Sequence, residues 1–226
     1  MNRFFDIPSD LQHSWLGLIA LHLREALLPV LAGLLLALPL AQLCVRLRWL
    51  YPPVLAVTTV LYAVPSLAFF VVLIDYTGQT ELTVMIPLTV YTLVVLVPAI
   101  VDGVRSVPPE TLAAARAMGL GPLRRYAQVQ LPIAVPAIIA GLRVATVSSI
   151  SLVSVGTLIG NQGALGNLLH DASIYNRPEL AWNAVLTMAV LAVLADALLV
   201  GVRALLTPWM PRGGRRPRSA AKDTAR

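Results

Sequence analysis

The side chains that perform most enzymatic chemistry are few in this chain, and their spacing matches no catalytic motif. The histidines, His13, His22 and His170, are far apart, and neither an H-E-x-x-H pattern nor a Cys/His pair is present, so no metal site of four such ligands is expected. Lys222 is the only lysine, and no glycine-rich phosphate loop precedes it, which excludes a P-loop nucleotide site. The sequence therefore predicts a chain without a catalytic centre, a metal or a cofactor of its own.

One acidic residue, Asp196, lies inside a long apolar stretch near the end of the chain. Ionisable groups in membrane helices usually face the bundle interior and pair with an opposite charge. Arg143, in another apolar stretch, is the candidate partner in an intramembrane pair. A second structural explanation for Asp196 is a hydrated position that faces the bundle interior. The functional alternative is a proton or ion relay, which normally needs several titratable groups in series.

Composition indicates a polytopic membrane protein. The 226 residues are 58% hydrophobic and 12% charged, with a mean hydropathy of +0.78, whereas soluble domains carry about 25% charged residues. The net charge of +6 comes from arginines at the ends of apolar stretches and in the tail. This distribution indicates membrane topology rather than nucleic-acid binding. The single cysteine excludes an internal disulfide.

Five apolar stretches are long enough to cross a bilayer, which requires about 20 residues. They are 26–45, 54–74, 83–101, 135–155 and 183–206. Residues 10–24 are amphipathic and are expected to lie along the membrane interface. The predicted fold is an all-α membrane protein with a transmembrane domain over 1–208 and a basic, disordered cytoplasmic tail over 209–226.

The basic residues give the orientation of these spans. With five spans, every basic residue except Arg3, Arg24 and Arg177 falls on one side of the membrane or near it. Basic residues favour the cytoplasmic side of a membrane. We therefore expect the N-terminus outside, the C-terminus in the cytoplasm, and the polar loop over 102–133 in the cytoplasm, with the tail held at anionic lipid.

The helix start and stop residues of this loop predict a helical hairpin. Pro109 suits the first turn of a helix, and Glu110 suits the positive N-terminal end of the helix dipole. An alanine-rich helix follows and is expected to stop at Gly119, after which a second short helix leads to a break at Leu131–Pro132. Small side chains on one helical face allow another protein to approach closely, which indicates a docking surface. The alternative to a docking role is an ordinary amphipathic loop. The candidate docking residues are Glu110, Ala113, Ala114, Arg116, Gly119, Leu131 and Pro132.

A glycine-rich segment lies between the last two spans. Its candidate residues are Gly160, Asn161, Gln162, Gly163 and Gly166. They indicate either a tight turn near a gate at the outer mouth or a glycine-rich external loop. Three aromatic residues within spans, Tyr62, Phe69 and Tyr91, either pack in the core or line a weak path for a solute.

Several motifs resemble ABC importer permeases. Residues 113–119 (AAARAMG) and 130–143 (QLPIAVPAIIAGLR) are similar to the EAA loop of that family. Residues 64–68 (VPSLA), 159–166 (IGNQGALG) and 195–199 (ADALL) resemble elements of its osmoprotectant branch, which takes up glycine betaine, choline, carnitine or proline betaine. The likeness covers roughly 15–208. One departure is Ala113, which stands where the family usually has glutamate.

The resemblance implies a type I, MetI-like permease subunit in the bacterial inner membrane. Its implied partners are a second permease subunit, identical or paralogous, an ATPase dimer that binds ATP and magnesium, and an extracytoplasmic binding protein. The loop would be the helix that enters the ATPase, and a low aromatic content (6%) would leave tight recognition of quaternary ammonium ions to the binding protein. Alternatives are a permease for another solute such as methionine, an ion-coupled secondary transporter, which would show an inverted repeat, and a non-transporting scaffold.

Overall fold

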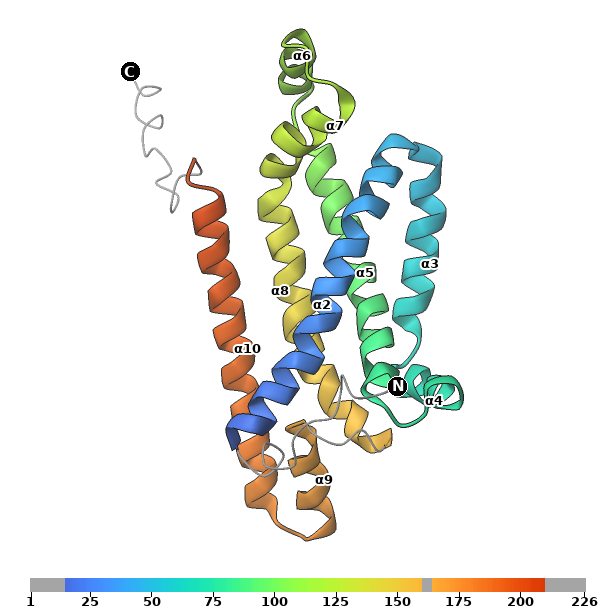
Figure 1. Ribbon diagram of the computed structural model, residues 1–226, viewed down its shortest axis with the longest axis vertical. Helices are drawn as coiled ribbons and strands as arrows, with labels where there is room; N and C mark the ends of the chain where they lie inside the picture. Colours follow the sequence, from blue (N-terminus) through green and yellow to red (C-terminus); the bar gives the residue numbers. More distant parts are fainter. Residues whose placement is uncertain (1–14, 160–163, 210–226) are drawn as a thin grey trace, which may run out of the picture.

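The computed structural model describes residues 15–159 and 164–209, and every regular element within these ranges is helical (Figure 1). The α-helices are α2 (Trp15–Arg46), α3 (Tyr51–Ala63), α4 (Ser66–Thr77), α5 (Glu81–Arg105), α6 (Pro109–Ala117), α7 (Pro122–Arg125), α8 (Leu131–Gly156), α9 (Gly166–Ile174) and α10 (Pro178–Leu206). Short helices η1 (Arg48–Leu50), η2 (Tyr126–Gln130) and η3 (Thr157–Ile159) join them. The all-α fold expected from the sequence is confirmed.

Four segments of the described chain are long and apolar enough to cross a membrane. They are Trp15–Arg46, Glu81–Arg105, Pro122–Ile159 and Pro178–Leu206. The pair Arg48–Ala63 and Ser66–Thr77 makes a fifth pass if the two helices are counted together. The structure thus contains about five membrane passes, as the apolar stretches predict.

The second pass differs from the continuous helix expected over 54–74. The chain bends by 93° between Arg48–Ala63 and Ser66–Thr77. Pro65 has no N–H to donate and disfavours a helical conformation at the preceding residue, and Val64 is accordingly extended, with φ −70° and ψ 124°. At the rise of a helix, η1 and α3 together extend about 25 Å, less than the roughly 30 Å of a bilayer core. A full crossing by this pair therefore needs residues from both sides of the break.

The first helix is longer than the span expected over 26–45. Residues 15–24, expected along the interface, continue directly into the span as α2, which has 32 residues. Neither glycine nor proline interrupts the helix between Leu18 and Leu28. Pro29 and Pro39 lie inside α2 without ending it, as membrane helices permit when neighbours supply the lost contacts.

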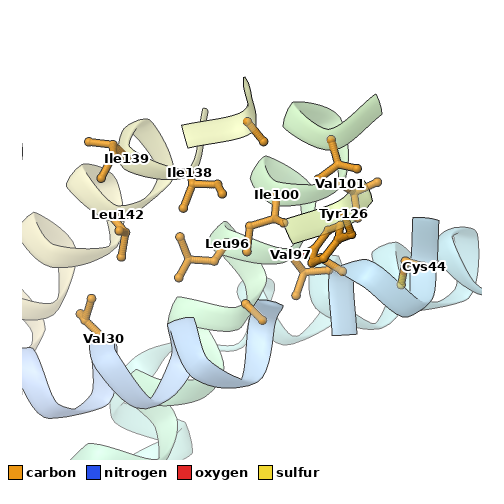
Figure 2. Packing of buried hydrophobic residues seen from close by; sticks show 14 residues of the cluster. Val30, Cys44, Leu96, Val97, Ile100, Val101, Tyr126, Ile138, Ile139 and Leu142 are labelled. Atoms are coloured by element: carbon orange, nitrogen blue, oxygen red, sulfur yellow. The ribbon is translucent and has the colours of Figure 1, made fainter. Parts of the chain in front are cut away.

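The core is formed where α2, α5 and α8 pack together. Figure 2 shows side chains of these helices and Tyr126 of η2 meeting in one buried cluster: Val30, Cys44, Leu96, Val97, Ile100, Val101, Tyr126, Ile138, Ile139 and Leu142. Small residues bring the backbones close together. A Cβ at Gly141 would lie 2.9 Å from the Cβ of Ala99, and one at Gly33 would lie 2.4 Å from the Cγ2 of Thr92.

Gly33→Ala is expected to destabilise the α2–α5 contact, because its new methyl group overlaps Thr92. Overpacking of this kind costs about 1–3 kcal/mol, and a thermal melt of the purified protein in detergent should show a lower Tm. Gly201→Ala is the matched control, since a Cβ at Gly201 meets nothing within 4 Å. Equal melting temperatures for the two variants would contradict this account of the packing.

Candidate functional site

The helices α6 and α7 form a hairpin that extends beyond one end of the bundle (Figure 1). We call residues 108–125 the α6–α7 hairpin. Pro109 occupies the first turn of α6, with Glu110 beside it, where a missing N–H costs nothing and an acid suits the dipole. α6 begins earlier than the alanine run alone suggests, because these two residues favour a helix start.

The turn between α6 and α7 is a Schellman motif. The N–H of Leu120 donates to the carbonyl of Ala115 (3.1 Å), and the N–H of Gly119 donates to that of Arg116 (2.9 Å). Gly119 has φ +76°, a left-handed conformation that glycine adopts without a steric penalty. The expectation that Gly119 ends the alanine-rich helix is therefore met, and the turn depends on glycine at this position.

Most of the candidate docking residues gather at the exposed end of the hairpin. Those exposed there are Glu110, Ala113, Ala114, Arg116 and Gly119. Ala115 is buried, whereas Met118 and Leu123 are 72% and 71% exposed. These two large apolar side chains are not among the docking residues predicted from the sequence, although apolar residues that flank a glycine turn in a polar loop are a recognisable signal.

Leu131 and Pro132 lie at the base of the hairpin, half-buried, and do not break the helix as expected. The segment Pro122–Ile159 is one continuous helical unit. The π-helical turn η2 accommodates the missing N–H of Pro132, and in it the N–H of Leu131 donates to the carbonyl of Tyr126. Pro132 itself lies in the first turn of α8. Such bulges let a helix pass a residue that cannot donate. Helical backbone thereby joins the hairpin to α8 without interruption.

The end of the molecule that carries the hairpin is also its basic end. The arginines there are Arg46, Arg48, Arg105, Arg116, Arg124, Arg125 and Arg203. The opposite end, which contains α9, carries Asp75, Glu81, Asp171 and Glu179. One arginine is also structural, because the guanidinium of Arg105 lies 4.6 Å above the ring of Tyr51. The preference of basic residues for the inside predicts the cytoplasmic side for the hairpin.

A cavity of about 580 Å3 lies at the break between α3 and α4, with walls from α5 and α8. The hydroxyl of Tyr91 donates to the carbonyl of Val64 (2.8 Å) and so satisfies a backbone group that the break exposes. The ring of Phe69 packs edge-on against Tyr91. Tyr62 and Tyr91 line the cavity, whereas Phe69 supports it from outside its wall.

The glycine-rich outer segment is only partly described. Gly160, Asn161, Gln162 and Gly163 lie outside the described residues. Gly166 begins α9, and a Cβ there would lie 2.6 Å from the Cγ2 of Thr157 and 2.9 Å from the Cα of Ser154. Glycine at this position lets α9 pack closely against the end of α8.

Arg143 and Asp196 form a two-point ion pair between α8 and α10. Arg143 Nε donates to Asp196 Oδ1 (2.6 Å), and Arg143 Nη2 donates to Asp196 Oδ2 (2.8 Å). The parallel geometry is that of the strongest carboxylate–guanidinium contacts. α10 lies at the edge of the bundle (Figure 1), so this pair is its main polar attachment to α8 within the described chain. In the described ranges, no cluster of three His, Cys, Asp or Glu residues could hold a metal.

These features define the fold of an ABC transporter permease of the MetI type. The chain matches a permease of the MetNI methionine ABC transporter, solved in inward-facing conformations, with a TM-score of 0.76 and 16% identity over 89% of this chain and 100% of that one. At this identity the likeness establishes the fold alone. Residues 30–212 match the family of binding-protein-dependent transport system inner membrane components, and the chain belongs to that family.

Relatives with similar sequences extend over most of the chain. A glycine betaine/carnitine/choline transport system permease protein from Bacillus subtilis (strain 168) is 30% identical, covering 85% of this chain and 84% of its own length. An osmoprotectant import permease protein from Salmonella typhimurium (strain LT2) is 30% identical over 87% and 89%. A choline transport system permease protein from Bacillus subtilis is 26% identical over 83% and 86%. This chain is thus a multi-pass inner-membrane transport component, a class that is not itself catalytic.

Proposed function

We propose that this chain is the permease subunit of an ATP-driven importer for osmoprotectants such as glycine betaine, choline, carnitine and proline. It would work with a second permease subunit, an ATPase dimer that binds the ATP and magnesium, and an extracytoplasmic binding protein. The observation that carries the proposal is the α6–α7 hairpin, which offers an exposed small-residue surface on the basic end and continues into α8.

The cargo assignment is supported by the relatives rather than by the fold. Those with similar sequences transport glycine betaine, carnitine or choline according to their names, and the match covers most of their length. The methionine transporter shares the fold at 16% identity, which does not bear on the solute. A secondary transporter is disfavoured because the intramembrane acid that could serve an ion relay, Asp196, is held by Arg143.

The hairpin provides the mechanical link. When the ATPase dimer closes, the hairpin moves with it, and the unbroken segment through η2 carries that movement into α8. α8 packs on α5 through the Gly141–Ala99 and Gly103–Ala137 contacts. Seams of small residues without large interlocking side chains permit sliding between packed helices, a common form of domain closure. The movement thereby reaches the cavity wall that α8 supplies.

Docking in this chain would depend on packing more than on charge. Ala113, Ala114 and Met118 are exposed on the hairpin, and Arg116 is the nearest cation along the chain. Alanine at position 113 cannot form a charged contact, so the apolar surface would fill the ATPase groove. Arg116 and Glu110 remain as the charged groups at its rim.

Uptake of labelled glycine betaine into proteoliposomes containing the complete importer tests this function. We expect saturable uptake that needs ATP and is lost when this chain is omitted. Unlabelled choline or carnitine should compete, and methionine should not. Methionine uptake with no uptake of betaines would contradict the cargo assignment, and failure of the ATPase to co-purify with this chain would contradict the coupling role.

A further inference from the structure

The cavity at the α3–α4 break lies between the two ends of the helix bundle. Thr92 on its α5 wall is roughly 20 Å from the Arg105 end of the helix and roughly 16 Å from the Glu81 end, at 1.5 Å per residue. The volume of about 580 Å3 lies within the roughly 300–1,000 Å3 typical of small-molecule sites. Its size and depth suit a site occupied in transit.

The wall of the cavity carries no formal charge. Its residues are Tyr62, Ala63, Val64, Pro65, Ser66, Leu88, Tyr91, Thr92, Val95, Ala145, Val147, Ser148, Ser149, Ser151 and Leu152. The wall therefore offers no charged partner to an ion. A zwitterion has no net charge and needs only separate partners for its two ends.

Four hydroxyls on this wall have no hydrogen-bond partner among the described residues. They belong to Tyr62, Ser66, Ser148 and Ser151. Ser148 and Ser151 are three positions apart on α8, so they are neighbours on one helical face, and both are exposed. Hydroxyl donors rotate freely and bind carboxylates through charge-assisted hydrogen bonds.

The α3–α4 break supplies further hydrogen-bond donors to the part of the cavity that suits a carboxylate. Ser66 is the first residue of α4, and no side chain caps this helix start. The N–H groups of a first helical turn and the positive end of the dipole favour an anionic group. Discontinuous helices in transporters place such ends toward the carboxylates of their substrates.

The remaining wall is aromatic and apolar. Tyr62, Tyr91, Leu88 and Val95 form it, with Tyr91 fixed by its bond to the Val64 carbonyl. An N-methylated ammonium has no N–H to donate and is held by aromatic faces and apolar contacts. The two parts of the wall therefore suit the two ends of one small molecule.

We infer that this cavity is a transit site for a zwitterion with a carboxylate and an N-methylated ammonium group. Ser148 and Ser151 donate to the carboxylate, and the ring of Tyr62 faces the ammonium. The inference rests on the proposed function and adds a substrate site within the permease chain itself.

Thiol labelling of the complete importer tests whether solute reaches the site. In a Cys44→Ser background, Ser148→Cys should react with a charged, membrane-impermeant methanethiosulfonate reagent during ATP turnover, because only a hydrated thiol ionises readily. Saturating glycine betaine should slow this reaction about fivefold or more. Leu198→Cys is the control, since Leu198 is 69% exposed on the apolar surface of α10 and should stay unreactive. A Ser148→Cys protein that is unreactive, or reacts equally with and without glycine betaine, overturns the inference.

Solute selectivity supplies the second test. The double variant Ser148→Ala/Ser151→Ala should lower the maximal uptake rate of glycine betaine about tenfold or more, because both hydroxyl donors to the carboxylate are lost and one charge-assisted hydrogen bond alone is worth about that factor. Choline has no carboxylate, so its uptake should fall by less than about twofold. Thr187→Val, on the exposed surface of α10, should change neither.

The outcomes separate this inference from the proposed function. An equal loss for both solutes, or no loss for either, overturns the transit site while wild-type uptake leaves the proposed function intact. A wild-type importer that takes up neither solute overturns the proposed function and the transit site together.

Discussion

Gly119→Val is expected to reduce ATP-driven uptake to below roughly a tenth of the wild-type rate while the bundle remains folded. Gly119 has φ +76°, and a left-handed conformation costs roughly 1–2 kcal/mol for a residue with a Cβ, more for a β-branched one. Relief of that strain would break the two turn hydrogen bonds and reorient α6 against α7. No neighbouring atom lies within 4 Å of the new Cβ, so the effect would act through the turn alone.

Gly121→Val is the matched control in the same turn. Its site is equally open, but Gly121 has φ −63° and ψ 167°, an extended conformation that valine adopts easily. Gly119→Asn should retain more activity than Gly119→Val, because asparagine tolerates the left-handed region. Uptake and ATP hydrolysis would be measured on monodisperse complexes, and equal rates for the two valine variants would show that the hairpin geometry does not carry coupling.

The hairpin and its glycine could be predicted because their signals are local. An alanine-rich run between Pro109 and Gly119 specifies its own start and stop. The pairing of Arg143 with Asp196 could also be proposed, because few ionisable residues occur in the apolar stretches and an acid there needs a partner. In both cases residue type and position along the chain were sufficient, and no knowledge of helix packing was needed.

The behaviour of prolines could not be predicted in the same way. α2 continues through Pro29 and Pro39, and the helix at Pro132 continues through a π-turn, whereas the chain breaks at Pro65. The difference depends on partners distant in sequence, such as Tyr91, whose hydroxyl satisfies the carbonyl of Val64. The cavity was missed for the same reason, because residues from four helices form its wall.

Asp196→Leu is expected to cause a several-fold loss of membrane-inserted protein. The change leaves the guanidinium of Arg143 on α8 without its carboxylate partner, and an unpaired charge within the membrane is strongly unfavourable. Losses of folding free energy of this kind commonly change cellular abundance several-fold. A fluorescent fusion at the C-terminus, measured in isolated membranes, would report the amount inserted.

Arg143→Leu/Asp196→Leu should recover most of that loss, because removing both charges also removes the cost of burying either one. This recovery separates a structural pair from a relay, since a relay would need the acid itself. Uptake per inserted molecule should then be close to that of the wild-type chain in the double variant and in Asp196→Asn. If wild-type uptake responded to an imposed pH gradient and Asp196→Asn lost that response, Asp196 would be a proton-relay residue and the structural explanation of the pair would be wrong.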